Sequence, residues 1–179
     1  MEQPTEGPAK AAMAAAYSVQ AVQMLRTVQV NSLTLSQMAD QKASILMGAT
    51  FLVFSITVSR ALSGEVPWSL VILAVSAFLS SLLAVAAVIP SVAKPPAGVK
   101  PNLMFFGHFA DLDEEQWTRD ILAQLHSDED VFRVMLHDIY QNGQVLQRRK
   151  YRYLALAYRT FIVGLVLTLT GFAVEMASS

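Results

Sequence analysis

The sequence predicts an all-α membrane protein: a transmembrane hairpin, a third spanning helix and a cytoplasmic helical bundle formed by the N-terminal arm and helices within 113–153. Three observations predict this class. Hydrophobic residues make up 54% of the 179 residues and charged residues only 15%, whereas a typical soluble domain has about 25% charged residues. Three long stretches carry almost no charge. The segments outside them have apolar residues that recur at helical spacing.

The first two uncharged stretches are each long enough to cross a bilayer, which requires roughly 20 mostly apolar residues and at least about 17. Seventeen uncharged residues separate Lys42 from Arg60, and 28 separate Glu65 from Lys94. The hairpin domain occupies 42–93, with spans at about 43–59 and 68–90.

The link between these spans marks the boundary of the membrane. Gly64 and Pro67 are turn and helix-breaking residues. Trp68 follows at the position of an interfacial aromatic belt. At the opposite boundary, Lys42 precedes the first span. We therefore expect Trp68 and Lys42 to act as membrane-boundary anchors.

The third span lies in the C-terminal segment 154–179, together with a short tail. Fifteen uncharged residues separate Arg159 from Glu175. A helix that begins at Leu154 reaches a spanning length if Arg159 extends its guanidinium to the interface or faces protein, so Arg159 is a third expected boundary anchor. A buried amphipathic or core helix is the alternative, although the apolar residues of this stretch cover the whole helix circumference.

The charges outside the spans indicate the orientation. Cytoplasmic loops carry an excess of Lys and Arg, and the segment between the second and third spans holds eight of them. They are Lys94, Lys100, Arg119, Arg133, Arg148, Arg149, Lys150 and Arg152. The short link carries one Arg and one Glu. We expect a multi-pass protein with a cytoplasmic N-terminus, an external link, a cytoplasmic 94–153 segment and an external C-terminus.

The water-facing segments read as helices. The arm, residues 1–41, is expected to be helical from about Ala9 and to continue into the first span, because no Pro or Gly separates them. In 94–153 a proline-rich connector precedes two helices, one running to about Leu125 and one over 128–174. Asp111 or Asp113 is the expected N-cap of the first, and Ser127 is the expected N-cap of the second.

A basic run precedes the third span and is the candidate binding site. It consists of Arg148, Arg149, Lys150 and Arg152. One interpretation is a topology anchor that meets anionic lipid headgroups, with each charge contributing about 1 kcal/mol. The other is a site for an anionic ligand such as a nucleotide phosphate.

No pattern indicates an enzyme, a resident cofactor or a metal site. The chain has no cysteine, and its three histidines lack the spacing of metal ligands. The acidic residues at 111–115 fit helix capping better than cation binding. Neither a phosphate-binding glycine loop nor a serine nucleophile motif occurs. A net charge of −1 gives no indication of nucleic-acid binding.

Four pieces of the sequence together resemble the Pycsar effector transmembrane domain family. They are ADQKASILMGAT at the first span, the proline-rich exit from the second, PNLMFFGHFADLDEEQW after it, and DIYQNGQVLQRRKYRYLALAYRTFIVGL. The resemblance extends from about Met38 to Phe172. Family features in these pieces are a D-x-K-A-x-I-L-x-G pattern, an N-L-x-F-F-G turn and a basic-aromatic K-Y pair before the last span.

This resemblance implies an antiphage effector of the bacterial inner membrane. In the family a partner cyclase makes a cyclic pyrimidine mononucleotide during infection, and the effector then impairs the membrane. Whether the nucleotide binds this chain directly stays open, because the roughly 60 residues between the second and third spans read as helices and not as a nucleotide-binding barrel. We expect a homo-oligomer that forms a pore or disrupts the bilayer. The alternative is a helical membrane scaffold or regulatory subunit that recruits a cytoplasmic partner.

Overall fold

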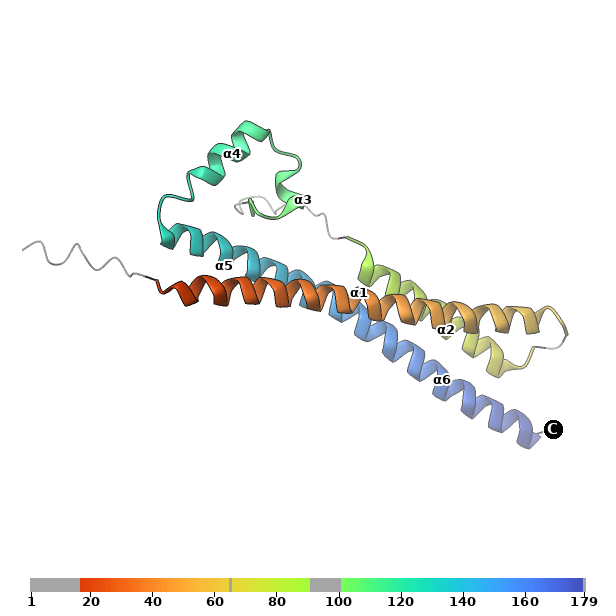
Figure 1. The fold of residues 1–179 in the computed structure, drawn as a ribbon. Coiled ribbons are helices and arrows are strands. Elements are labelled where there is room, and N and C mark those ends of the chain that lie inside the picture. The colour runs from red at the N-terminus through yellow and green to blue at the C-terminus, as the bar shows by residue number, and fades with distance from the viewer. Residues whose placement is uncertain (1–16, 65, 91–100, 179) are drawn as a thin grey trace, which may run out of the picture.

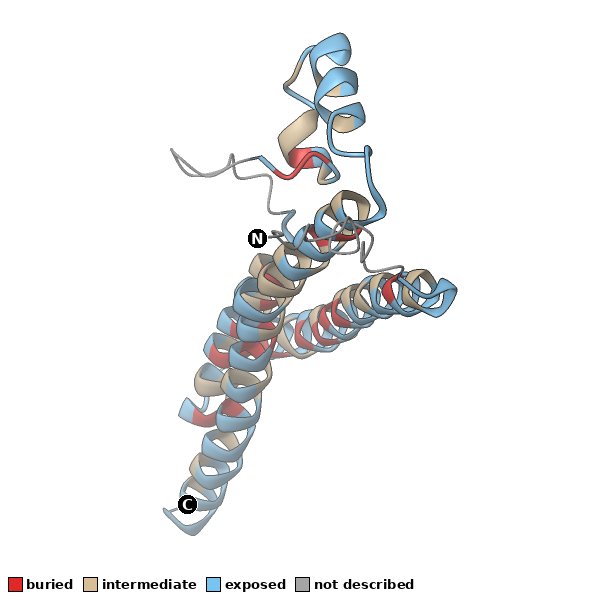
Figure 2. Cartoon of the chain, turned by 90° about the vertical axis from the view of Figure 1, so that its left-hand side faces the viewer, coloured by how far each residue is buried: buried red, intermediate tan, exposed pale blue. Residues whose placement is uncertain are grey.

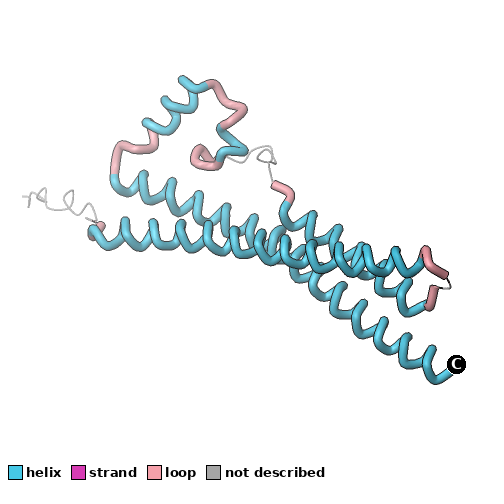
Figure 3. The backbone as a smooth tube through the Cα atoms, turned by 45° about the vertical axis from the view of Figure 1, so that its right-hand side comes forward, coloured by secondary structure: helices cyan, strands magenta, loops and turns pink. Residues whose placement is uncertain are grey.

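The computed structural model describes residues 17–64, 66–90 and 101–178, and every regular element in these ranges is a helix (Figures 1 and 3). The elements are α1 (Val19–Ala61), α2 (Trp68–Val88), α3 (Phe106–Phe109), α4 (Glu114–Leu122), α5 (Asp128–Val145), the π-helical segment η2 (Leu146–Tyr151) and α6 (Arg152–Ser178). The predicted all-α class is confirmed. The expected helix start near Ala9 lies outside the described residues.

Among the described residues, three helices are long and apolar enough to cross a membrane. α1 has 43 residues, α2 has 21, and α5, η2 and α6 form one unbroken helix of 51 residues. At about 1.5 Å per residue, the first and third greatly exceed a hydrocarbon core of about 30 Å. Both therefore extend beyond their apolar stretches, and their polar halves lie side by side at one end, here called the polar end (Figure 1). The prediction that arm and first span form one helix is confirmed for α1.

Small residues let α2 and α6 pack closely in antiparallel order. The buried Ser80 hydroxyl donates a hydrogen bond of 2.8 Å to the carbonyl oxygen of Ala157. One turn further along, Gly164 lies directly against Ser76, where a Cβ on the glycine would be only 2.1 Å from the serine Cβ. Close backbone approach of this kind holds helices together in membranes, where lipid leaves little hydrophobic driving force between them.

All three long helices meet in one small core next to the polar end. Its buried members are Ala39, Ala43 and Leu46 of α1, Ala84 and Ala87 of α2, and Leu154 and Ala157 of α6. Beyond this core α6 diverges from α1 while it stays beside α2 (Figure 1). Buried residues follow the helix contacts, and most of the remaining surface is exposed (Figure 2).

Of the two expected caps of α4 the structure uses Asp113, and the expected cap Ser127 of α5 is confirmed. The Asp113 carboxylate accepts the backbone N–H of Gln116 at 3.1 Å, and the Ser127 hydroxyl accepts that of Asp130 at 3.2 Å. α4 ends at Leu122, three residues before the expected Leu125. The helix expected over 128–174 continues to Ser178 and contains a π-helical segment.

Within the expected bundle, α5 and α4 have different partners. The rings of Tyr17, just before α1, and Phe132 in α5 meet edge to face with centroids 4.6 Å apart. α4 is held by the turn before it: the Trp117 indole N–H donates to the Leu103 carbonyl oxygen at 2.9 Å, and its ring lies 5.2 Å from that of Phe109. α4 is therefore attached to α3 and the turn that precedes it.

Candidate ligand cleft at the polar end

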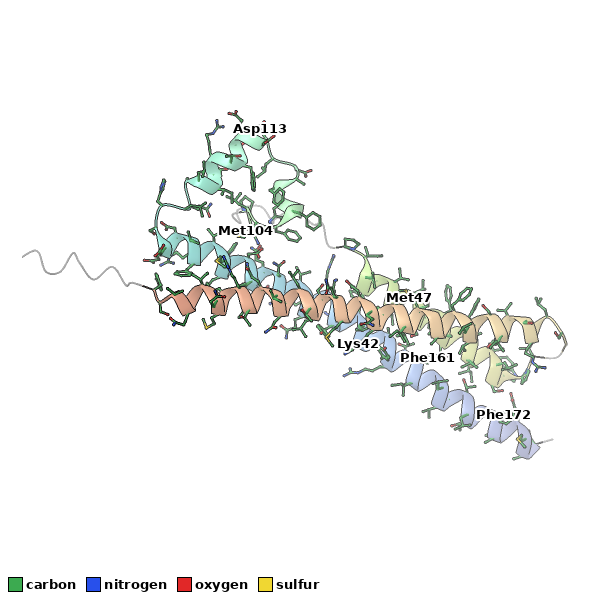
Figure 4. All side chains as sticks on the ribbon, viewed as in Figure 1. Lys42, Met47, Met104, Asp113, Phe161 and Phe172 are labelled. Carbon is green, nitrogen blue, oxygen red and sulfur yellow. The ribbon has the colours of Figure 1, made fainter. Side chains whose placement is uncertain are left out.

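A cleft of about 860 Å³ opens between α1, the α5–η2 helix and the segment 104–109. Phe105, Phe106 and Phe109 form an aromatic wall, and α1 contributes Leu33 among other residues to the opposite wall. Met104 lies beside them, between α3 and α5 (Figure 4). The volume falls within the range of about 300–1,000 Å³ that is usual for small-molecule sites.

One asparagine fixes the aromatic wall in place. Asn102 is 2% exposed. Its side-chain amide donates to the Asp138 carboxylate on α5 at 3.0 Å, and its amide oxygen accepts the Met104 N–H at 3.0 Å. Its own backbone N–H donates to Nδ1 of His108 at 2.9 Å. Since buried polar groups need partners, this set of bonds specifies one conformation for the turn and holds the phenylalanines against the cleft.

A bridge between α1 and η2 forms part of the cleft lining. The Lys150 ammonium lies 2.8 Å from both carboxylate oxygens of Asp40 and donates to the Ser36 hydroxyl at 2.8 Å. The lysine side chain is 20% exposed and the aspartate 39%. Arg26, more than three turns before Asp40 on α1, also lines the cleft. Two cations and two carboxylates, Asp40 and Asp138, therefore face the same space.

The structure divides the predicted basic run. Lys150 faces α1 and lines the cleft, whereas Arg148, Arg149 and Arg152 are exposed and do not line it. Three of the four cations fall within η2, whose wider π turn is a feature that recurs at functional sites.

Sequence reasoning did not identify two elements of this cleft. The Asp40–Lys150 pair joins residues 110 apart, and the Asn102–Asp138 bond joins residues 36 apart. The available signal was weak: Asp40 is the first charge after the uncharged stretch 27–39, and Asn102 is a lone amide before an apolar run.

The expected boundary anchors occupy different levels of the helix bundle. The rings of Phe54 on α1 and Phe78 on α2 lie 6.0 Å apart, so these two residues are at the same level of the hairpin. Lys42 is 12 residues before Phe54, so in the antiparallel hairpin it is level with Pro90, just past the end of α2. Trp68 begins α2 and is 79% exposed.

Arg159 is also exposed, but it lies two residues after Ala157, which bonds to Ser80 well inside α2. A groove of about 580 Å³ between α2 and α6 includes both Trp68 and Arg159 in its lining. Their roles at a membrane boundary remain predictions, and for Arg159 the role requires a guanidinium that extends toward the interface.

No group of three or more His, Asp or Glu side chains that could hold a metal ion occurs within the described part of the chain. Among the residues at 111–115, Asp113 serves as the α4 cap and Glu115 forms an exposed ion pair with Arg119 at 3.8 Å.

Comparison with protein families gives one match that covers most of the chain. The model of the Pycsar effector protein domain matches residues 23–176. The matched range takes in nearly all of α1 and α6 and all elements between them, and thus both the cleft and the three candidate spans. No curated protein and no solved structure matches the chain.

Proposed function

We propose that this chain, which belongs to the Pycsar effector protein domain family, impairs the bacterial inner membrane when a cyclic pyrimidine mononucleotide binds in the cleft. Membership in the family gives the chain an antiphage effector role in a membrane and a functional pairing with a nucleotide cyclase. The chain itself performs no catalysis in this proposal. The cyclase supplies the signal, and the membrane is the target.

The observation that carries this proposal is the continuity of one helix. Asn142, Leu146 and Lys150 line the cleft, and the same unbroken helix, Asp128–Ser178, contains the third candidate span. A ligand that changes the contacts of these residues with α1 therefore acts on the end of a helix whose other end lies in the bilayer. Helix shifts of this kind are a common form of switching.

The cleft offers partners for each part of such a nucleotide. Phenylalanine rings stack on bases, with an energy of about 1–3 kcal/mol per base. Asn142 and Gln29 bring amide groups suited to the polar edge of a pyrimidine. The cyclic phosphate carries a negative charge that Arg26 and Lys150 can neutralise. In this arrangement the phosphate competes with Asp40 for the Lys150 ammonium, which loosens the bridge between α1 and η2.

The exposed arginines at 148, 149 and 152 receive a different role in the proposal. Outside the cleft and immediately before the apolar stretch of α6, they meet anionic lipid headgroups. Lys42 meets headgroups in the same way at one boundary of the hairpin, and Trp68 lies at the other boundary through its amphipathic indole ring.

Membrane damage requires more than one copy in the proposal. Three spans are too few to enclose an aqueous path, so the active form is a homo-oligomer that opens a pore or disturbs the surrounding bilayer. We place the N-terminus and the polar end in the cytoplasm, where the cyclase product is made.

The proposal is tested by expressing the full chain with and without a pyrimidine cyclase and recording growth and membrane potential. We expect arrest and depolarisation only when both are present. Arg26→Gln, which removes a phosphate contact and keeps the Asp40–Lys150 bridge, should reduce the response strongly. Arg119→Gln on α4, outside the cleft, should leave it unchanged at equal membrane abundance. A full response of Arg26→Gln would contradict the assignment of the cleft, and arrest without the cyclase would contradict nucleotide activation.

A second candidate function rests on the exposed end of α4. Leu122 and Leu125 are 58% and 46% exposed, which suits the recruitment of a cytoplasmic partner by a membrane scaffold. A partner that copurifies at fixed stoichiometry, together with harmless coexpression with the cyclase, would favour this function over the first.

A further inference from the structure

A stripe of exposed apolar residues runs along the polar half of α1. Met24, Val28, Asn31, Leu35 and Met38 follow one another at steps of four, three, four and three residues. This is the spacing of the contact positions of a coiled coil. The four apolar members are 63%, 38%, 45% and 43% exposed, in chain order. We call these five residues the α1 seam.

Among the residues that the structure describes, no other element buries the side chains of the α1 seam. Leu25 and Ala39 are the buried residues in this half of the helix, and the cleft side carries Leu33, Ser36 and Asp40. The thirteen residues 27–39 include no charged side chain. A helix face that stays in water normally carries charged residues. The composition of this segment therefore indicates a protein partner.

We infer that the α1 seam binds the α1 seam of a second copy of this chain, in a parallel coiled coil. Copies inserted in one membrane share the same orientation, so their α1 helices are parallel and level with each other, as a heptad contact requires. The positions that flank such a contact are neutral: Gln20, Thr27, Thr34 and Gln41. Over residues 24–38, identical helices therefore meet without like charges facing each other.

Asn31 gives this contact a register. A carboxamide has both donors and an acceptor, so two Asn31 side chains at the same level satisfy each other. A polar residue at one contact position selects register and partner number in coiled coils, at some cost in stability. A pairing shifted by one heptad would place each amide against Met24 or Met38.

The spacing of the α1 seam continues into the apolar half of α1. Ile45, Leu52 and Ile56 extend it by steps of seven, seven and four residues, and they are 62%, 63% and 63% exposed. Lys42 occupies the contact position between the two halves, where its long side chain can turn outward to headgroups. The contact thus has two parts. In the polar half of α1 it is stabilised by burial of apolar side chains from water, and in the apolar half the same helix face continues within the lipid.

This inference rests on the proposed function, because it names the surface through which the oligomer forms. The absence of native cysteine allows a direct test by single cysteines in the full chain in membranes. A disulfide needs Cα atoms within about 4.4–6.8 Å. Under mild oxidation we expect covalent dimers for Val28→Cys and Leu35→Cys. Leu33→Cys is the matched control, being an exposed leucine on the same helix but on the cleft side.

Dimers at positions 28 and 35 with at least a tenfold lower yield at 33 would support the α1 seam. Equal yields at all three positions, or none at 28 and 35, would overturn it. A second pair of variants separates this result from the proposed function: Leu35→Glu places charge in the contact, and Gln37→Glu places it on an exposed position of α1 that belongs neither to the seam nor to the cleft. If the cysteine variants form no dimers at positions 28 and 35 but growth arrest is intact, the seam would be overturned and the proposed function would remain. If the cysteine variants form dimers at the seam while Leu35→Glu still causes full growth arrest, the result would support the seam and contradict the need for an oligomer.

Discussion

At the scale of single residues, Lys150 differs from the arginines around it because Asp40 holds its ammonium group at 2.8 Å. Lysine is a compact point charge that is suited to exchange one anion for another, whereas arginine forms a planar fork. Lys150 is the member of the basic run that is placed to respond to a ligand, and the three arginines are placed to meet the membrane surface.

The first prediction concerns the competition for Lys150. Asp40→Asn keeps the shape and hydrogen-bonding oxygen of the side chain but removes the charge that a phosphate has to displace. We expect the dissociation constant for a cyclic pyrimidine mononucleotide to fall by roughly tenfold, which corresponds to about 1.4 kcal/mol. Titration calorimetry in detergent measures it, with the exposed Asp120→Asn as control. Weaker binding by Asp40→Asn would contradict the competition.

The second prediction concerns the arginines. Single replacements of Arg148, Arg149 and Arg152 by Lys conserve the charge that lipid headgroups require but remove the forked contact that a bound phosphate would use. We expect growth arrest and depolarisation to be unchanged in all three variants at matched membrane expression. Loss of activation in one of these variants would indicate that the phosphate binds that arginine and not the cleft.

At the scale of elements, the pairing of α2 with α6 depends on a missing side chain. Gly164→Ala would place a Cβ 2.1 Å from both the Cβ and the Oγ of Ser76. Overpacking of a well-packed contact typically costs about 1–3 kcal/mol. We expect a lower thermal midpoint in detergent and easier proteolysis between α2 and α6.

The matched variants make this third prediction specific. Ser76→Gly removes both clashing atoms, so the double variant Gly164→Ala with Ser76→Gly should recover most of the lost stability. Gly48→Ala should have little effect, because its Cβ would meet nothing within 4 Å. If the double variant is no more stable than Gly164→Ala alone, the two helices do not meet at this position.

The elements that could be predicted from the sequence are those set by local pattern. Charge-free length predicts the three long helices. The acidic first turns predict the cap Ser127 and narrow the other cap to Asp111 or Asp113, of which the structure uses Asp113. The cleft depends instead on how helices align: Lys150 reaches Asp40 only because α5, η2 and α6 run without a break along α1. Likewise, α4 is attached to the preceding turn because the Trp117 indole donates to the Leu103 carbonyl.

The small residues of the spans show the same division. Thr50, Ser76 and Ser80 are buried at helix contacts, while Ser44 and Ser55 are exposed. Composition indicates that such residues mediate packing, but only the rotation of each helix decides which of them do so.

At the scale of the whole molecule, the polar end and the apolar helices form one continuous unit, so the orientation of the chain decides where the cleft faces. The fourth prediction is that reporters fused after Leu125 and after Ser178 give opposite readings, cytoplasmic for the first and external for the second, because the helix Asp128–Ser178 crosses the membrane between them. If both reporters give a cytoplasmic reading, the helix does not cross the membrane and the third span is wrong.

The measurement that tests the account most directly is leakage from liposomes that contain the purified full chain at a defined orientation and carry an entrapped dye. We predict release of the dye on addition of cyclic CMP or cyclic UMP, no release with the linear nucleotides, and little release from Arg26→Gln. Binding of a cyclic nucleotide without any leakage, or equal leakage with and without nucleotide, would contradict the claim that a ligand bound in the cleft makes this chain impair the membrane.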